Sequence, residues 1–226
     1  MDSPIRPRVK ICCIASAEEA RLAVAAGAAA VGFVSAMPSG PGILDEERIA
    51  EIAPRIPPGV ASFLLTCAER ADAIVAQQRR CRTNTLQLCD RVGVDTYARL
   101  RDALPGVALV QVIHVVGEDA LREAEAVAPH VDAVLLDSGD PTAPVKQLGG
   151  TGRRHDWAIS RRIRDAIDTP LYLAGGLRAD NVAEAIATVA PFGVDVCSGV
   201  RTNGALDPRR LRGFFDAVSS VTRTEA

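Results

Sequence analysis

The sequence predicts an α/β fold of the (β/α)8 type, the TIM barrel, in which eight parallel strands close into a ring and a helix follows each strand. Eight short apolar runs alternate with eight helical segments, one pair about every 25 to 30 residues. The runs are nearly continuous in apolar residues, as expected for parallel strands covered on both faces. The length of 226 residues suits one such barrel, and an open doubly wound sheet is the alternative.

The first helix has the clearest local signals. Ser16 fits an N-cap, Glu19 follows three residues later, and Gly27 closes the helix. Asp45 begins the second helix in the same way. We expect strands at 9–14, 29–34, 60–65, 85–88, 107–113, 131–136, 170–174 and 194–197, and helices at 16–27, 45–55, 70–79, 96–104, 118–127, 156–166, 180–189 and 207–219.

No linker or change in composition divides the chain, so one domain is expected over 1–226, with flexible tails at 1–7 and 220–226. The net charge of −2, the absence of a basic run and the single Trp argue against a nucleic-acid partner. No run of about 18 apolar residues and no signal-peptide core is present, so we expect a cytoplasmic protein without a membrane partner.

Six cysteines are distributed without a CxxC pair, which does not indicate a zinc site, and we expect them to be reduced. In a barrel of this type, chemistry is located where strands end and the following loops begin. Cys12 lies near the carboxyl end of the first strand, and Asp137 directly follows the sixth. Lys10 precedes Cys12 by two residues and therefore points in the same direction along the strand, so we expect it to bind the substrate or its phosphate.

Glycine motifs follow the last three strands. Gly175-Gly176 and Ser198-Gly199 follow strands seven and eight, the usual phosphate site of barrels, where glycine lets backbone N–H groups approach an anion. A tight turn is the alternative for either motif alone. Gly150-Thr151-Gly152 lies in the long segment 137–155, where it forms either a substrate-covering loop or a purely structural loop.

Taken in order, these motifs resemble the phosphoribosylanthranilate isomerase family of tryptophan biosynthesis over nearly the whole chain. The segments that carry the resemblance are Val9-Lys-Ile-Cys-Cys-Ile, Leu86-Gln-Leu88, Leu135-Leu-Asp-Ser138, Gly149-Gly-Thr-Gly152 before Asp156-Trp157, Leu173-Ala-Gly-Gly-Leu177 before Asn181-Val182, and Val194-Asp-Val before Ser198-Gly-Val200.

The resemblance implies an Amadori rearrangement of N-(5-phosphoribosyl)anthranilate, a phosphorylated sugar-amine, without cofactor or metal, in an enzyme whose mesophilic relatives are mostly monomers. It assigns the general base to Cys12 and the general acid to Asp137. A thiol tuned by nearby positive charge, for example that of Lys10, suits the first role, and a carboxyl screened from water suits the second. A buried packing cysteine and a loop or cap carboxylate are the structural alternatives.

The chain departs from the family pattern at the catalytic end. Cys13 stands where the family has glycine, Asp90 closes strand four, and Ser39-Gly-Pro-Gly42 has no arginine to hold the anthranilate carboxylate. Two alternatives are therefore a paralogous isomerase or lyase acting on another phosphosugar, and a non-enzymatic phospholigand or thiol sensor. The candidates to replace the lost charge are Arg153, Arg154 and Arg201, and those for a thiol sensor are Cys13, Cys89 and Cys197.

Overall fold

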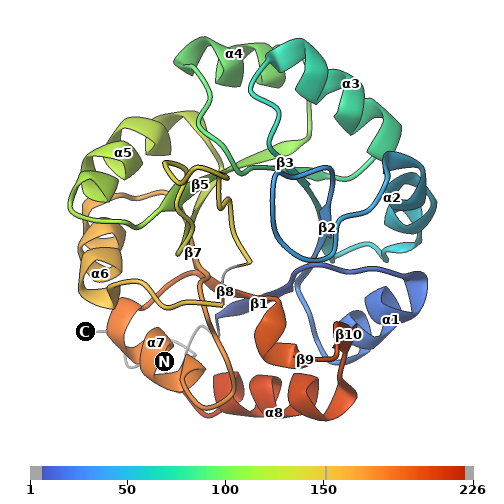
Figure 1. The fold of residues 1–226 in the computed structure, drawn as a ribbon, viewed down its shortest axis with the longest axis vertical. Helices are drawn as coiled ribbons and strands as arrows, with labels where there is room; N and C mark the ends of the chain where they lie inside the picture. The colour runs from blue at the N-terminus through green and yellow to red at the C-terminus, as the bar shows by residue number, and fades with distance from the viewer. Residues whose placement is uncertain (1–6, 151, 222–226) are drawn as a thin grey trace, which may run out of the picture.

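A computed structural model describes residues 7–150 and 152–221. Eight parallel strands form a closed barrel in chain order, and β8 pairs with β1 to complete the ring. This closure confirms the barrel and rules out the open sheet (Figure 1). The strands are β1 (Arg8–Ile11), β2 (Ala30–Val34), β3 (Ala61–Thr66), β4 (Thr85–Leu88), β5 (Ala108–His114), β6 (Ala133–Asp137), β7 (Leu171–Leu173) and β8 (Gly193–Val196).

A ring of helices surrounds the strands (Figure 1). They are α1 (Ala17–Ala25), α2 (Glu46–Ile52), α3 (Ala71–Cys81), α4 (Val94–Ala103), α5 (Asp119–Val127), α6 (Trp157–Ala166), α7 (Val182–Val189) and α8 (Pro208–Ser219). Short 3-10 helices η1 (Ala53–Arg55) and η2 (Ala128–His130) extend α2 and α5. The sequence did not predict η3 (Ser198–Val200) or the hairpin of β9 (Arg201–Thr202) and β10 (Ala205–Leu206).

The expected helix caps are present. The Ser16 hydroxyl accepts a hydrogen bond from the Glu19 backbone N–H, and the Asp45 carboxylate accepts one from Arg48. Gly27 has φ +102°, in the left-handed region that favours glycine after a helix. These local interactions set where α1 and α2 begin and where α1 ends.

The apolar residues form two cores. One lies between the strands and the surrounding helices and includes Ile11, Leu64 and Phe214. The other fills the barrel interior and includes Phe63, Val112 and Tyr172. Because side chains alternate along a strand, β2, β3, β5, β6 and β7 supply residues to both cores.

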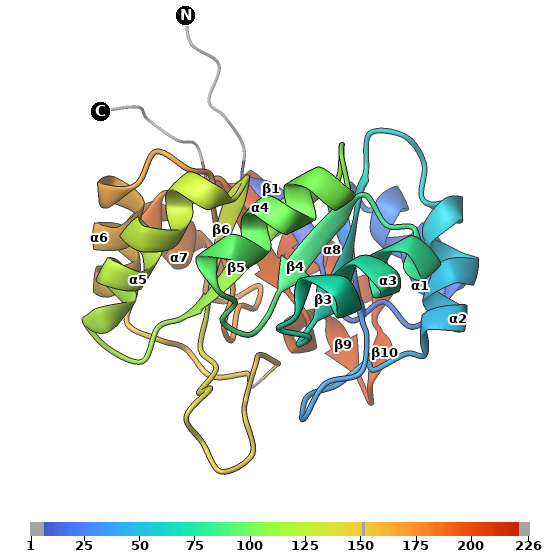
Figure 2. The ribbon, with the colours of Figure 1, turned by 90° about the horizontal axis from the view of Figure 1, so that it is seen from above.

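Loops gather at the carboxyl end of the barrel. The segments after β2 and β6 and the β9–β10 hairpin all lie at this end (Figure 2). The Ser39 hydroxyl in the loop after β2 donates a 2.7 Å hydrogen bond to the Lys146 carbonyl in the loop after β6. A methyl group on Gly150 would lie 2.6 Å from Pro41, so these two loops also pack closely. Together they roof the barrel mouth.

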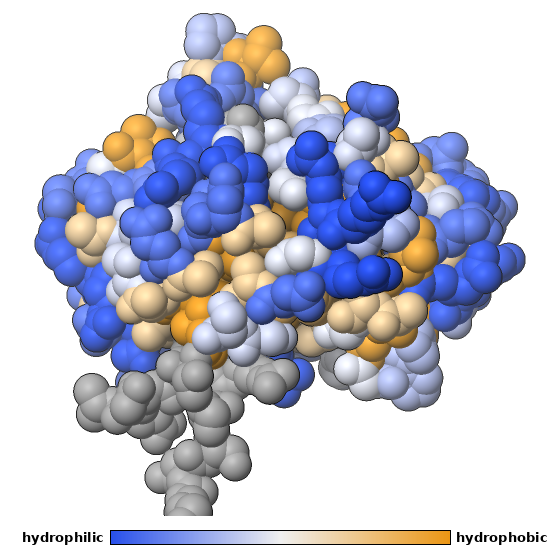
Figure 3. All heavy atoms as spheres, turned by 90° about the horizontal axis from the view of Figure 1, so that it is seen from below, coloured by the Kyte–Doolittle hydropathy of each residue, from blue (hydrophilic) through white to orange (hydrophobic). Residues whose placement is uncertain are grey.

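The outer surface shows no large uniform patch on the face seen in Figure 3, where hydrophilic residues alternate with small apolar areas. Among the described residues, no helix combines the length and apolar character needed to cross a bilayer. Of the expected tails, 1–6 and 222–226 lie outside the described residues. Pro7 is buried and Ser220 is the C-cap of α8.

Candidate active site

A cavity open to solvent lies under the roof formed by the two loops, and its empty space, with the solvent-filled mouth included, is about 700 Å³. Its position at the carboxyl ends of the strands is where barrel enzymes place their chemistry. The structure brings seven of the sequence-predicted site residues to its wall: Cys12, Asp137, Gly150, Gly152, Gly175, Gly176 and Ser198. Thr151 lies outside the described residues.

Cys12 directly follows β1 and is buried in the cavity wall. Its backbone N–H donates a 2.9 Å hydrogen bond to the Val196 carbonyl of β8, which continues the sheet pairing by one residue. On the neighbouring strand β2, a methyl group on Gly32 would lie 3.1 Å from the Cys12 Sγ atom. The missing side chain of Gly32 therefore leaves room for the Cys12 thiol.

Asp137 ends β6, and its carboxyl also faces the cavity. Burial raises the pKa of this carboxyl above its ordinary value, although the Ser138 N–H donates a 2.7 Å hydrogen bond to Oδ1 and opposes the shift. A methyl group on Gly149 would lie 2.8 Å from Oδ2, so the loop after β6 passes directly over the acid. The site thus holds a partly buried carboxyl with a raised pKa, which suits it to donate a proton.

Lys10 is placed differently from the expectation that it binds substrate. Its side chain is fully buried, lies inside the barrel and does not line the cavity. The ammonium lies 3.0 Å from Asp195 Oδ2 and 5.1 Å from the centre of the Phe63 ring. Burial opposes the charge, but Asp195 and Cys12 outweigh it and raise the pKa of Lys10. Lys10 therefore acts on the site as a fixed positive charge beside Cys12.

The glycine loops after β7 and β8 form one end of the cavity. Gly175 and Gly176 have φ values of +84° and +62°, a backbone that L side chains rarely adopt. Gly199 does not line the cavity, since a methyl group there would lie 2.0 Å from the Leu177 carbonyl oxygen. A glycine is therefore required at position 199 for the loops after β7 and β8 to pack together. Ser198, the preceding residue, lines the cavity.

His155 packs behind the first glycine loop. A methyl group on Gly175 would lie 2.9 Å from His155 Nδ1, and Nε2 is 2.8 Å from the Ser160 hydroxyl. Burial lowers the pKa of His155 to about 4, so the ring is neutral near pH 7. It supports the loop without adding a positive charge.

Three further thiols line the cavity, those of Cys13, Cys89 and Cys197. Hydrogen bonds with Cys12 and Cys197 raise the pKa of Cys13, and the hydrogen bond from Cys13 lowers the pKa of Cys197. Burial raises the pKa of Cys89. Within 7–150 and 152–221, no group of three or more His, Cys, Asp or Glu side chains is placed to hold a metal ion.

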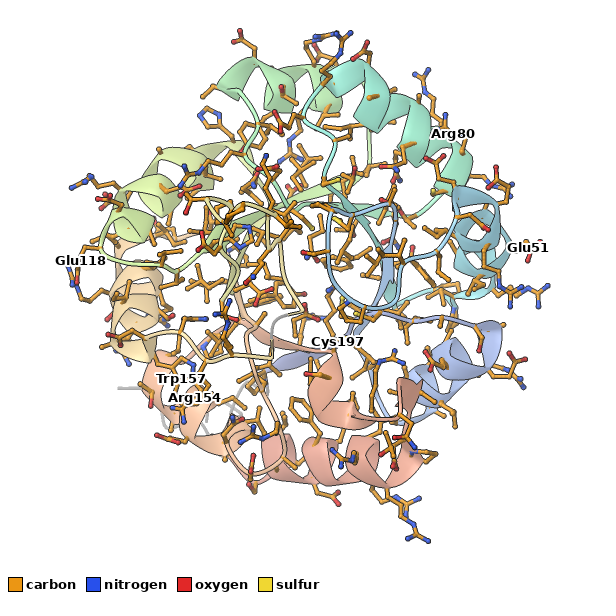
Figure 4. The ribbon with its side chains drawn as sticks, in the orientation of Figure 1. Glu51, Arg80, Glu118, Arg154, Trp157 and Cys197 are labelled. Carbon is orange, nitrogen blue, oxygen red and sulfur yellow. The ribbon has the colours of Figure 1, made fainter. Side chains whose placement is uncertain are left out.

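None of the three candidate arginines lines the cavity. Arg201 is 7 % exposed and ion-paired with Glu19 at 2.8 Å. The Arg154 guanidinium stacks 3.7 Å from the Trp157 ring centre, toward the outer rim, far from Cys197 near the barrel centre (Figure 4). Arg153 donates to the Gln147 side chain in the loop after β6. Among the described residues, the cavity wall therefore contains no lysine or arginine.

Sequence reasoning missed two polar residues of the wall, Gln87 and Asp195. Gln87 Oε1 and Asp195 Oδ1 are buried acceptors with no hydrogen-bond partner among the described side chains and backbone. Both are single polar residues inside otherwise apolar strands, Leu86-Gln-Leu88 and Val194-Asp-Val196. That pattern could have identified them, because an unpaired buried acceptor is costly unless a ligand satisfies it.

Comparisons with known proteins point to one family. A family model described as N-(5'-phosphoribosyl)anthranilate (PRA) isomerase matches residues 9–217. The chain is 36% identical to the N-(5'-phosphoribosyl)anthranilate isomerase of Haloferax volcanii, over 95% of this chain and 94% of the relative. It is 38% identical to that of Halobacterium salinarum, over 92% and 93% of the two chains.

Solved structures give the same picture. The phosphoribosylanthranilate isomerase of Thermotoga maritima superposes with a TM-score of 0.81 at 29% identity, covering 95% of this chain and all of that one. A phosphoribosylanthranilate isomerase in complex with reduced 1-(o-carboxyphenylamino)-1-deoxyribulose 5-phosphate superposes with a TM-score of 0.79 at 27% identity, over 95% and 100% of the two chains. The chain belongs to the N-(5'-phosphoribosyl)anthranilate isomerase family.

Proposed function

We propose that the protein catalyses the Amadori rearrangement of N-(5-phosphoribosyl)anthranilate to 1-(2-carboxyphenylamino)-1-deoxyribulose 5-phosphate. One observation carries this proposal: a thiol and a partly buried carboxyl, on strands that are not neighbours in the barrel, share one cavity with two glycine loops. The cavity supplies a base, an acid and a phosphate-binding end to one small molecule.

Asp137 acts first, as the general acid. Because burial raises its pKa, a larger fraction of the carboxyl carries its proton near neutral pH than for an exposed aspartate. It donates this proton to the furanose ring oxygen, and the C1′–O bond breaks to give an open-chain Schiff base. The loop over Asp137, at Gly149, limits contact with water during this step.

Cys12 acts second, as the general base. Its thiolate removes the proton from C2′ of the Schiff base and leaves an enolamine that tautomerises to the ketone. The buried ammonium of Lys10, held by Asp195, places a fixed positive charge near the thiolate as it forms. Lys10 therefore supports the base electrostatically and does not contact the substrate.

The phosphate binds at Gly175, Gly176 and Ser198, which form the end of the cavity after β7 and β8. Glycine backbone in the left-handed region turns N–H groups toward an anion, and no side chain blocks its approach. The Ser198 hydroxyl adds one donor. Gly150 and Gly152 belong to the covering loop and close the cavity over the sugar.

Among the residues that the structure describes, the cavity wall offers the anthranilate carboxylate no direct cation. A charge-assisted hydrogen bond contributes about 1.5–3 kcal/mol, so its absence weakens binding of this group by about one to two powers of ten. N-(5-phosphoribosyl)aniline lacks the carboxylate and isolates this effect. We expect this protein to discriminate between the two substrates less than an isomerase that retains the arginine after β2.

The test is loss of phosphoribosylanthranilate fluorescence at micromolar enzyme. Turnover by the wild-type protein, with loss of activity in Cys12→Ser and Asp137→Asn and retained folding by circular dichroism, supports the proposal. No turnover at high enzyme concentration refutes it. A clear preference for the aniline substrate or for another phosphosugar would instead assign a paralogous isomerase.

The proposed function extends to the oligomeric state, location and partners of the protein. We propose a cytoplasmic monomer whose ligand is a phosphorylated sugar-amine and which has no nucleic-acid partner. The six cysteines are all free thiols, as in a reducing compartment. Sedimentation equilibrium across a hundredfold concentration range tests the monomer, and a constant mass near 23.8 kDa is the expected result.

A further inference from the structure

Arg201 joins the hairpin after β8 to the backbone beside the proposed base. Its Nη2 atom donates to the Cys13 carbonyl at 2.5 Å and to the Cys12 carbonyl at 3.2 Å. Nη1 donates to Glu19 at 2.8 Å and to the Gly204 carbonyl at 2.9 Å. One guanidinium therefore binds the carbonyls of Cys12 and Cys13, the two residues with which the loop after β1 begins.

Glu19 fixes the guanidinium in place. Its carboxylate accepts from the Ala15 N–H at 3.0 Å and from the Leu206 N–H at 2.8 Å, in addition to both Arg201 nitrogens. The side chains of Arg201 and Glu19 are only 7 % and 13 % exposed. This network connects the end of β1, the first turn of α1 and the β9–β10 hairpin through buried, charge-assisted bonds.

The backbone at this point needs such support. Cys13 has φ +61°, which is the left-handed region and is strained for a residue with a Cβ atom. Its side chain has room because the residue above it is Gly42, where a methyl group would lie 2.6 Å from the Cys13 Cβ atom. A relaxed backbone at Cys13 would rotate the adjoining peptide and turn the Cys12 side chain relative to the cavity.

We infer that Arg201 is a positioning residue for Cys12: with Glu19 it holds the strained turn at Cys13 so that the Cys12 thiol faces the cavity. The inference rests on the proposed function, in which Cys12 is the base. Arginine suits the role because its planar fork serves two carbonyls and a carboxylate at once, which a lysine does not. Arg201 is therefore not available to bind a substrate carboxylate.

The test compares Arg201→Met with Arg201→Met/Cys13→Gly. In the single variant we expect kcat to fall about 10- to 100-fold through misplacement of the base, while KM stays within about threefold because the phosphate end is intact. In the double variant glycine adopts the turn without strain, and most of kcat returns. The matched control is Arg101→Met, since Arg101 also bonds a carboxylate and a backbone carbonyl, those of Asp132 and His130.

The outcomes separate the two proposals. Unchanged kcat in R201M, or a kcat loss that C13G does not restore, overturns the positioning role. So does a pH profile of kcat that moves in R201M, since this would show that Arg201 acts through its charge. A loss of kcat in R101M equal to that in R201M would also overturn the positioning role, because it would show that R201M acts through general destabilisation.

Two further experiments cover the cases in which R201M does not fold or the wild-type protein lacks turnover. If R201M does not fold, Arg201→Lys with and without C13G replaces it, and the same rescue is required. If the wild-type protein lacks turnover, the proposed function fails alone. The inference is then tested by alkylation of Cys12 with iodoacetamide, located by peptide mass spectrometry. The rate should fall in R201M and recover in the double variant, and equal rates would refute it.

Discussion

Lys10→Met offers the sharpest test of how the site is built. Lys10 is fully buried inside the barrel, and its closest charged partner is Asp195 at 3.0 Å. Methionine retains the length and apolar stem of lysine but removes the ammonium. The substitution therefore leaves the Asp195 carboxylate buried without its cation, which is among the most costly single changes in a protein interior.

The expected magnitude has two independent estimates. Removing one partner of a buried ion pair destabilises a protein by about 3–5 kcal/mol. Alternatively, Asp195 takes up a proton in the variant, and holding it protonated at pH 7 against its ordinary pKa of 3.8 costs about 4 kcal/mol. The two values agree. A loss of 4 kcal/mol lowers the Tm of a chain of this size by roughly 8–16 °C.

The loss of unfolding free energy in Lys10→Met depends on pH. Burial raises the folded pKa of Asp195 above its unfolded value, so the folded variant binds the proton more tightly and stability is lost as pH rises through the folded pKa. The same calculation gives about 1.6 kcal/mol at pH 5. Urea denaturation of wild type and K10M at pH 7 and pH 5 measures both values.

Lys10→Met/Asp195→Asn is the control, because it removes the uncompensated charge. We expect it to regain at least about 2 kcal/mol relative to Lys10→Met at pH 7. A K10M deficit below about 1 kcal/mol at pH 7, or one that does not shrink at pH 5, would refute the view that this pair is buried and charged.

Three other predictions follow from the site. Gly199→Ala places a methyl group against the backbone after β7, so it should lower the free energy of unfolding by about 3 kcal/mol and raise KM. Gly117→Ala is the control: it has open space around it and should change the free energy of unfolding in urea by less than about 0.5 kcal/mol. Wild type should lose stability as pH falls from 6.5 toward 4 because the lowered pKa of His155 makes the unfolded chain bind the proton first; His155→Gln should lack this slope, and an unchanged slope would contradict the assignment. Cys89→Ser and Cys197→Ser should keep turnover within about tenfold of wild type, and a loss as deep as that of Cys12→Ser would point to thiol chemistry beyond a single base.

Local sequence signals gave the elements and much of the site. Ser16, Asp45 and Gly27 act at short range, so the limits of α1 and the start of α2 could be predicted. The apolar runs predicted parallel strands, and the rule that barrel chemistry lies at strand ends brought Cys12 and Asp137 to one cavity. Those steps depend on neighbours in the chain or on a property of the whole fold.

The roles of the charged residues depended on contacts between distant segments. Lys10 was expected in the cavity because alternation along a strand gives a direction, but alternation does not give depth, and the partner Asp195 is on the last strand. Arg201 was a candidate for substrate binding until its bonds to Glu19 and to two carbonyls after β1 were known. Residues about 180 positions apart meet only because the barrel closes.

The sequence by itself therefore determined the barrel, its eight repeats, the family and the residues at the strand ends, since periodicity, caps and motif order are encoded locally. Tertiary structure alone decided which charges face the ligand and which are neutralised inside the protein. Closure of β8 on β1 places Asp195 against Lys10 and Arg201 against the turn at Cys13. The physical reason is that burial and ion pairing depend on three-dimensional distance, which no local pattern specifies.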